Sequence, residues 1–229
     1  MPVAVIAIVL LLTSTVWDGV FTTAQATRGQ VVYDRQCSTC HGWDLAGRNA
    51  RPLKGDVFYR NWGEDSLGSL YSVVRDSMPR NAPGTLSEQD YLDVVAYILQ
   101  RNDYPAGANE LTRAGVGDVQ VVGKNGPAPV PNFSLVRVVG CLEEAAGTWR
   151  LTRASEPART RLPAPSVGDE RRRSDAAVGG TGTFELMDTY GATDGHAGHR
   201  VEVKGLLMRG PSNKLNFSSF QMLAERCAP

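Results

Sequence analysis

The stretch that decides the fold is Cys37-Ser38-Thr39-Cys40-His41, near the start of a 229-residue chain. Two cysteines three positions apart, followed at once by a histidine, form the Cys-x-x-Cys-His signature of covalent haem attachment. Thiols at this spacing reach the two vinyl groups of one haem and form thioethers. His41 then supplies a neutral imidazole nitrogen to the iron. The motif therefore predicts one haem c, with its iron, held by Cys37, Cys40 and His41.

A Cys-x-x-Cys pair alone also fits a redox dithiol or half of a zinc site. A thioredoxin-like dithiol follows a strand, whereas the residues before Cys37 predict a helix. A structural zinc ion needs two further ligands, and no Cys or His occurs between His41 and Cys141. Haem attachment is the interpretation that uses all three residues of the motif.

A second axial ligand to the iron is expected at Met78. Met and His are the usual ligands at this position, and the remaining histidines, His196 and His199, lie in the other half of the chain. Met78 precedes Pro79, which disfavours helix at the residue before it and turns the chain. A Met in such a loop can point its thioether inward, and His/Met ligation raises the haem potential.

Three amphipathic helices are predicted around the motif, over residues 27–36, 66–76 and 87–101. Ser87 begins the last of them as an N-cap, with acidic residues in the first turn, where the helix dipole favours them. The residues between 42 and 63 are rich in Gly, Pro, Asn and Arg and predict a loop.

Residues 28–111 resemble a class I cytochrome c domain. The segments that carry the resemblance are the helix into CSTCHG, Gly47, Pro52-Leu53, Trp62, MPRNAPGTLS and DVVAYILQRN. The resemblance implies a small all-α fold around the haem, with the Pro52 carbonyl bound to the second nitrogen of His41. It also implies five haem-lining residues: Leu53, Trp62, Tyr71, Tyr97 and Leu99. Within the family, the pattern is similar to cytochromes that serve quinoprotein alcohol or sugar dehydrogenases.

The N-terminus predicts export. Residues 3–12 are almost entirely apolar, and the small-x-small triplet Ala24-Gln25-Ala26 follows. This pattern is typical of a secretory signal peptide over residues 1–26, with a mature chain that begins near Thr27. A periplasmic or otherwise exported protein is expected, and an uncleaved leader would associate it with the membrane.

The second half changes character. A linker is predicted over residues 113–131, and a small all-β domain over 132–229. Five short strands favour a small antiparallel barrel or sandwich. The domain also resembles OB-like barrel domains of uncharacterised bacterial proteins, a resemblance that implies no activity. The insertion 155–182, rich in Pro, Arg, Ala and Gly, is expected to be a flexible loop.

Cys141 and Cys227 are expected to form a disulfide. Both lie in a domain predicted to occupy an oxidising compartment, and they flank its first and last strands. The alternative is a pair of unrelated buried thiols. His196 and His199 could hold a metal, but no carboxylate or Cys pattern completes a site, so they are interpreted as surface histidines.

These features together predict an electron carrier rather than an enzyme. Net charge is zero and no basic-aromatic face is visible, so nucleic acid is not an expected partner. The expected partners are redox proteins, such as a quinoprotein dehydrogenase or a terminal oxidase. Two alternatives stay open: a haem subunit or docking module of a quinoprotein alcohol or sugar dehydrogenase, and a haem peroxidase, which needs an open iron position.

Overall fold

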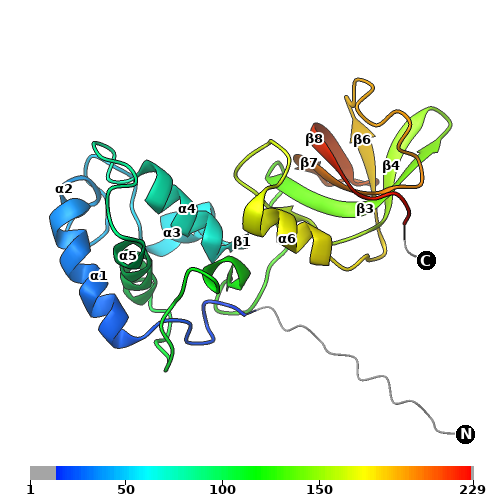
Figure 1. The fold of residues 1–229 in the computed structure, drawn as a ribbon. Coiled ribbons are helices and arrows are strands. Elements are labelled where there is room, and N and C mark those ends of the chain that lie inside the picture. Colours follow the sequence, from blue (N-terminus) through cyan, green and yellow to red (C-terminus); the bar gives the residue numbers. More distant parts are fainter. Residues whose placement is uncertain (1–13, 228–229) are drawn as a thin grey trace, which may run out of the picture. The chain divides into compact units, whose positions relative to one another are not determined.

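The computed structural model describes residues 14–227, which form two compact units (Figure 1). The first unit contains the described residues up to 61 together with 70–121, and the second contains 62–69 and the described residues from 122 onward. The division differs from the predicted domain boundaries. Segment 62–69 belongs to the second unit, and residues 113–121, predicted as linker, belong to the first.

The first unit is helical, and α4 begins in the segment assigned to the second. Its helices are α1 (Thr23–Gln36), α2 (Ser38–His41), α3 (Gly55–Trp62), α4 (Leu67–Ser77) and α5 (Glu88–Arg101). The three helices expected from apolar periodicity are present as α1, α4 and α5. Ser87 caps α5 as predicted, with Asp90 completing a reciprocal capping box. Helix α3 lies where a loop was expected.

Helices α1 and α5 pack closely because α1 has a glycine at their crossing. A Cβ atom on Gly29 would lie 1.8 Å from the Asp93 carbonyl oxygen. Beside this contact the Arg28 guanidinium makes two hydrogen bonds to the Asp93 carboxylate, at 2.8 and 3.1 Å. The Asp93 side chain is only 3% exposed and the Arg28 side chain 45%, so this ion pair joins a buried carboxylate of α5 to a solvent-facing guanidinium of α1.

Residues ahead of the predicted start at Thr27 are part of the first unit. Val16 and Phe21 are fully buried, and the Thr22 hydroxyl caps α1 by accepting from the Gln25 amide. The buried Gln25 side chain exchanges two hydrogen bonds with the Leu111 backbone. The rest of the predicted leader, residues 1–13, lies outside the described residues. Among the described helices, none is long and apolar enough to cross a membrane.

The predicted linker is also partly folded. It contains the 3-10 turn η1 (Val116–Asp118) and the short strand β2 (Gln120–Val121), and its buried side chains include Val116, Val119 and Val121. A further short strand, β1 (Asp65–Ser66), precedes α4. Residues 113–121 are therefore a folded part of the first unit and not a linker.

The second unit is rich in β-sheet. Its main strands are β3 (Leu135–Ala145), β4 (Thr148–Ala154), β6 (Gly182–Met187), β7 (Arg200–Met208) and β8 (Lys214–Ala224), close to the five predicted, and the short β5 (Ala158–Arg159) is added. The strand order is β4-β6-β8-β7-β3-β5, and β3 also pairs with β4. Strands β6 and β8 are parallel, so the expectation of a purely antiparallel sheet is wrong for this pair.

The insertion 155–182 is not simply a loop, because it contains helix α6 (Gly168–Ala176). Val201 and Val203 point into the apolar core, and the intervening side chains of β7, Glu202 and Lys204, point to the opposite face. That face is covered: Glu202 is 1% and Lys204 0% exposed. The Lys204 ammonium binds the Glu170 carboxylate of α6 at 2.6 Å. The insertion therefore closes over a charged sheet face instead of remaining flexible.

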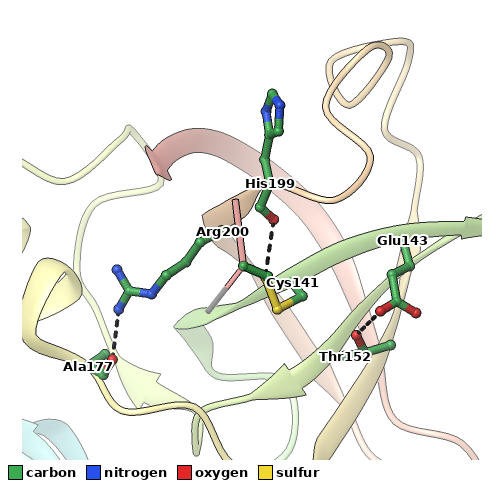
Figure 2. Close-up of a disulfide and its surroundings, with 7 residues drawn as sticks. Cys141, Glu143, Thr152, Ala177, His199 and Arg200 are labelled. Atoms are coloured by element: carbon green, nitrogen blue, oxygen red, sulfur yellow. Dashed lines mark hydrogen bonds between the residues drawn. A yellow bond between two sulfur atoms is a disulfide. The ribbon is translucent and has the colours of Figure 1, made fainter. Parts of the chain in front are cut away.

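A disulfide joins Cys141 to Cys227, as expected, with their Cα atoms 5.6 Å apart (Figure 2). Cys141 lies within β3, and Cys227 follows β8. The Cys227 amide also donates to the Gly198 carbonyl at 3.0 Å. The bridge thus fixes the C-terminal end of the chain to the first strand of the unit and to the turn before β7.

Candidate haem site

The attachment motif begins where α1 ends. The backbone makes one further helical turn, with the His41 amide donating to the Cys37 carbonyl at 2.9 Å and Gly42, at φ 82°, terminating α2. The Tyr33 hydroxyl donates to the Gly42 carbonyl at 2.8 Å and secures this turn to α1. Cys37 is half-buried and Cys40 exposed, and neither forms a disulfide. Both thiols are therefore available on one helical turn.

The His41 ring is oriented by a backbone carbonyl. Its Nδ1 lies 2.8 Å from the carbonyl oxygen of Arg51. A carbonyl only accepts, so Nδ1 must carry the proton, and Nε2 keeps its lone pair for a metal. The resemblance had implied Pro52 as the partner; the oxygen belongs to the residue before it, because the turn presents that carbonyl to the ring.

The loop that delivers Arg51 is fixed at several points. The Gly47 amide donates to the His41 carbonyl at 2.8 Å, and Gly47 adopts φ 85°. A Cβ atom there would lie 2.8 Å from the Ala50 carbonyl oxygen, so only glycine fits without displacement. The Asn102 side chain joins the loop to α5, since it donates to the carbonyls of Leu53 and Ile98.

Met78 follows the last residue of α4 and is half-buried. Its amide donates to the Val74 carbonyl at 3.1 Å, and its carbonyl accepts from the Tyr91 hydroxyl at 3.0 Å. The backbone of this candidate ligand is therefore held from both α4 and α5. A thioether on a fixed backbone is a suitable iron ligand.

The five residues expected to line the haem lie in different surroundings. Tyr71, Tyr97 and Leu99 are buried, with the Tyr97 ring 5.3 Å from that of Tyr33. Leu53 is half-buried. Trp62 belongs to the segment assigned to the second unit, where the Arg161 guanidinium lies 4.3 Å from its ring centroid.

A buried hydroxyl tests whether these residues fit a haem. The Tyr71 hydroxyl has no hydrogen-bond partner of normal geometry in the described part of the chain, and burial raises its pKa. The guanidinium groups of Arg75 and Arg113 lie 5.5 and 5.4 Å from the Tyr71 ring. An unsatisfied donor beside two cations suits an anionic group such as a haem propionate. The donor set of thiols, imidazole and thioether likewise suits haem iron.

The surroundings of the motif fit a redox dithiol less well than they fit haem attachment. Reactive cysteines have depressed pKa values, because nearby positive charge or a helix N-terminus stabilises the thiolate. Here burial, with a smaller contribution from Cys40, raises the pKa of the Cys37 thiol to about 11. Within the described residues, no group of three or more His, Cys, Asp and Glu side chains is placed to hold a metal ion, which disfavours a four-ligand structural zinc site at the motif.

Comparison with known proteins defines the class of this unit. Residues 24–98 match the family model described as cytochrome c oxidase, cbb3-type, subunit III. These residues form a cytochrome c family domain, which implies haem c and electron transfer. The helical fold and the Cys-x-x-Cys-His motif predicted from the sequence agree with that assignment.

Individual relatives are similar to part of the chain. A thiosulfate dehydrogenase from Stutzerimonas stutzeri (strain A1501) is 34% identical over 80 residues, which are 31% of this chain and 25% of the relative. The chain thus matches a quarter of that protein's length. The sulfane dehydrogenase SoxCD from Paracoccus pantotrophus shows 21% identity over 38% of this chain and 53% of its own, with a TM-score of 0.28, too low to assign a fold.

The first of these relatives corrects one expectation. The sequence predicted a protein that is not an enzyme, and that prediction is wrong in light of the comparison, because the curated relative is itself a named dehydrogenase. The prediction rested on the haem motif, which describes the cofactor domain and says nothing of the reaction that supplies its electrons.

The roles of several site residues were not predicted from the sequence. Neither the Arg51 carbonyl nor the Tyr91 hydroxyl belongs to a recognisable motif, since one is a backbone atom and the other acts on a backbone atom. The role of Asn102 could have been predicted, because a polar residue directly after an amphipathic helix often binds nearby backbone.

Proposed function

We propose that this chain carries one covalently bound haem c with His41 and Met78 as axial ligands, and that it relays single electrons. The observation that carries the proposal is the hydrogen bond from His41 Nδ1 to the Arg51 carbonyl, because it prepares Nε2 as a metal ligand next to two available thiols.

Each residue has a physical task in this proposal. Cys37 and Cys40 anchor the haem covalently, His41 supplies the imidazole, and Met78 supplies the thioether. When bound, haem iron carries one electron by alternating between its ferrous and ferric states. Tyr71, with Arg75 and Arg113 on its ring, supplies positive charge and a hydroxyl donor for a propionate. The buried side chains of Tyr97 and Leu99 exclude water.

The proposed setting is the periplasm, where the electrons come from a partner or a domain that oxidises a substrate. The partial similarity to a thiosulfate dehydrogenase makes a reduced sulfur compound, with thiosulfate first, the substrate class to assay. Reduced sulfur compounds thus replace alcohols and sugars as the first candidate substrates. A quinoprotein dehydrogenase and a terminal oxidase are still proposed as redox partners to be tested.

The second unit is proposed to be an OB-like barrel that docks the haem domain to its partner. The strand pairings support this reading, since β3-β4-β6-β8-β7 form a circuit that returns to β3, with the parallel pair between β6 and β8. The proposal assigns no ligand to the barrel.

The rival function is a haem peroxidase, which requires an open coordination position. Ferrous protein with both axial ligands in place should bind carbon monoxide poorly, whereas a peroxidase-like iron should bind it readily. Met78→Ala should open the iron to carbon monoxide and lower the reduction potential while the haem stays attached. Met187→Ala, in strand β6, is the matched control and should change neither property. Strong carbon monoxide binding by the unaltered protein would favour the peroxidase.

A further inference from the structure

The two histidines of the second unit face each other across a short distance. The Nδ1 atoms of His196 and His199 lie 3.1 Å apart, and the ring centroids are 5.2 Å apart. As neutral rings, the two can share one proton in a hydrogen bond. Both rings are half-exposed, so the pair is accessible from solvent.

The backbone holds this pair in place. The His199 amide donates to the His196 carbonyl at 3.1 Å, which forms a tight turn that puts both side chains on one side. The His199 carbonyl accepts from the Leu142 amide at 3.0 Å and lies 3.6 Å from Cys227 Sγ. Figure 2 shows the His199 ring directed away from the disulfide that anchors this corner. The His196 ring packs 4.8 Å from that of Phe220.

The separation of the two nitrogens suits a shared metal ion. With metal–nitrogen bonds of about 2.0 to 2.1 Å, two ligands of a tetrahedral ion lie about 3.3 Å apart. Two adjacent ligands of a square-planar ion lie about 2.9 Å apart. The observed 3.1 Å falls between these two values. A pair already at ligand spacing on a fixed turn needs little rearrangement to chelate.

We propose that His196 and His199 form a bidentate site for a divalent transition-metal ion, of the class Zn²⁺, Cu²⁺ or Ni²⁺. Imidazole nitrogen is a preferred ligand of these ions. No third His, Cys, Asp or Glu side chain within the described residues completes a cluster with them, so water fills the remaining positions. The site shares no residue with the haem motif, whose histidine is His41.

The test uses the full-length, haem-loaded protein in its ferric form, titrated with Zn²⁺ in a calorimeter. We expect one ion per chain, at least tenfold weaker binding in His196→Gln and in His199→Gln, and no measurable binding in the double variant. Tyr190→Phe, which changes a 91% exposed side chain of the same loop, is the control and should bind as the unaltered protein does.

A second measurement does not depend on the variants. Electron paramagnetic resonance of the unaltered ferric protein with one equivalent of Cu²⁺ should show hyperfine splitting from two nitrogen ligands. Absence of a stoichiometric Zn²⁺ site in the unaltered protein, or equal binding by the double variant, would overturn the proposal. A copper spectrum with only oxygen ligands would do the same.

Discussion

His41 Nδ1 is hydrogen-bonded to the carbonyl oxygen of Arg51 over 2.8 Å, so a loop ten residues further along the chain sets the orientation of the candidate iron ligand. The loop can do this because the Gly47 amide is bound to the His41 carbonyl and Gly47 occupies the left-handed region. The site thus depends on backbone geometry as much as on the motif itself.

Gly47→Ala should disturb the site more than a matched glycine substitution. Gly47 and Gly84 have similar positive φ angles, 85° and 72°, so alanine costs about 1 to 2 kcal/mol of backbone strain at either position. Only at Gly47 does the new Cβ also meet backbone, 2.8 Å from the Ala50 oxygen. Thermal unfolding and redox titration should show a larger loss of stability, and a shifted potential, in Gly47→Ala alone. Equal effects in both variants would show that the close backbone contact at Gly47 is unimportant for the site.

The folded part of the sequence ahead of Thr27 should contribute to stability. A chain that starts at Thr27 lacks buried Val16 and Phe21, the Thr22 cap and the Gln25 bonds to Leu111. Loss of the cap alone costs about 1 kcal/mol, and burial of one large apolar side chain contributes about 2 kcal/mol. We therefore expect a chain starting at Ser14 to unfold at clearly higher denaturant concentration than one starting at Thr27. Identical midpoints would show that residues 14–26 are dispensable.

The disulfide should stabilise the second unit. It closes a loop with a sequence separation of 86 residues, for which the chain-entropy model gives roughly 4 to 5 kcal/mol as an upper figure. The double variant Cys141→Ser/Cys227→Ser should lose about 2 to 4 kcal/mol in urea unfolding, while the haem absorption of the first unit is unchanged at low denaturant. Reduction of the unaltered protein should reproduce the loss. A double variant as stable as the oxidised protein contradicts this expectation.

Helix α6 should loosen at low pH. Burial by itself raises the pKa of Glu170, but the hydrogen bonds from Lys204 and Thr160 outweigh burial, so its pKa lies below the usual 4.5. A lowered carboxyl pKa stabilises the folded state above that usual value, and the stabilisation is lost as pH falls through the folded-state pKa. The protection of the amides over residues 168–176, after correction for the intrinsic exchange rate, should therefore fall as the pH drops below about 4.5.

Glu170→Gln should remove most of this pH dependence and cost about 1 to 3 kcal/mol at neutral pH, because Lys204 is 0% exposed and loses its charged partner. Glu185→Gln is the matched control. Its ion pair with Lys214 has the same residue types and a distance of 2.8 Å, but both side chains are about one-third exposed. Such pairs contribute less than about 1 kcal/mol. Similar losses in the two variants would show that burial of the Lys204 pair is unimportant.

The sequence predicted best the elements that carry their own pattern. Helix α5 has an apolar repeat and an N-cap at Ser87, and its predicted range, 87–101, agrees with the observed Glu88–Arg101 to one residue. Strand β7 has an equally local pattern, the alternation of Val201 and Val203 with Glu202 and Lys204. The alternation gave the correct inner face. It does not show that the opposite face is covered, because the cover comes from a distant insertion.

Helix α6 was missed because GDERRRSDA has no apolar face. Its stabilising contacts come from the sheet. Lys204 binds Glu170, and the Arg200 guanidinium donates to the carbonyls of Ser174 and Asp175 at the C-terminal end of the helix. It also donates to the Ala177 carbonyl, as Figure 2 shows. No local pattern within residues 155–182 indicates those partners in β7. The Arg51 carbonyl was missed for a related reason, since side-chain patterns do not identify which backbone oxygen faces His41.

The central claim is that Cys37 and Cys40 bind one haem covalently. The most direct measurement denatures the exported protein, extracts it with acidified ketone, and records the pyridine haemochrome spectrum and intact mass of what remains. We expect one haem to stay with the chain and to give the spectrum of a haem with two thioether bonds, whereas Cys37→Ser/Cys40→Ser should lose it. Haem that extracts completely from the unaltered protein, or two cysteines that remain free to alkylation after export and haem loading, would contradict it.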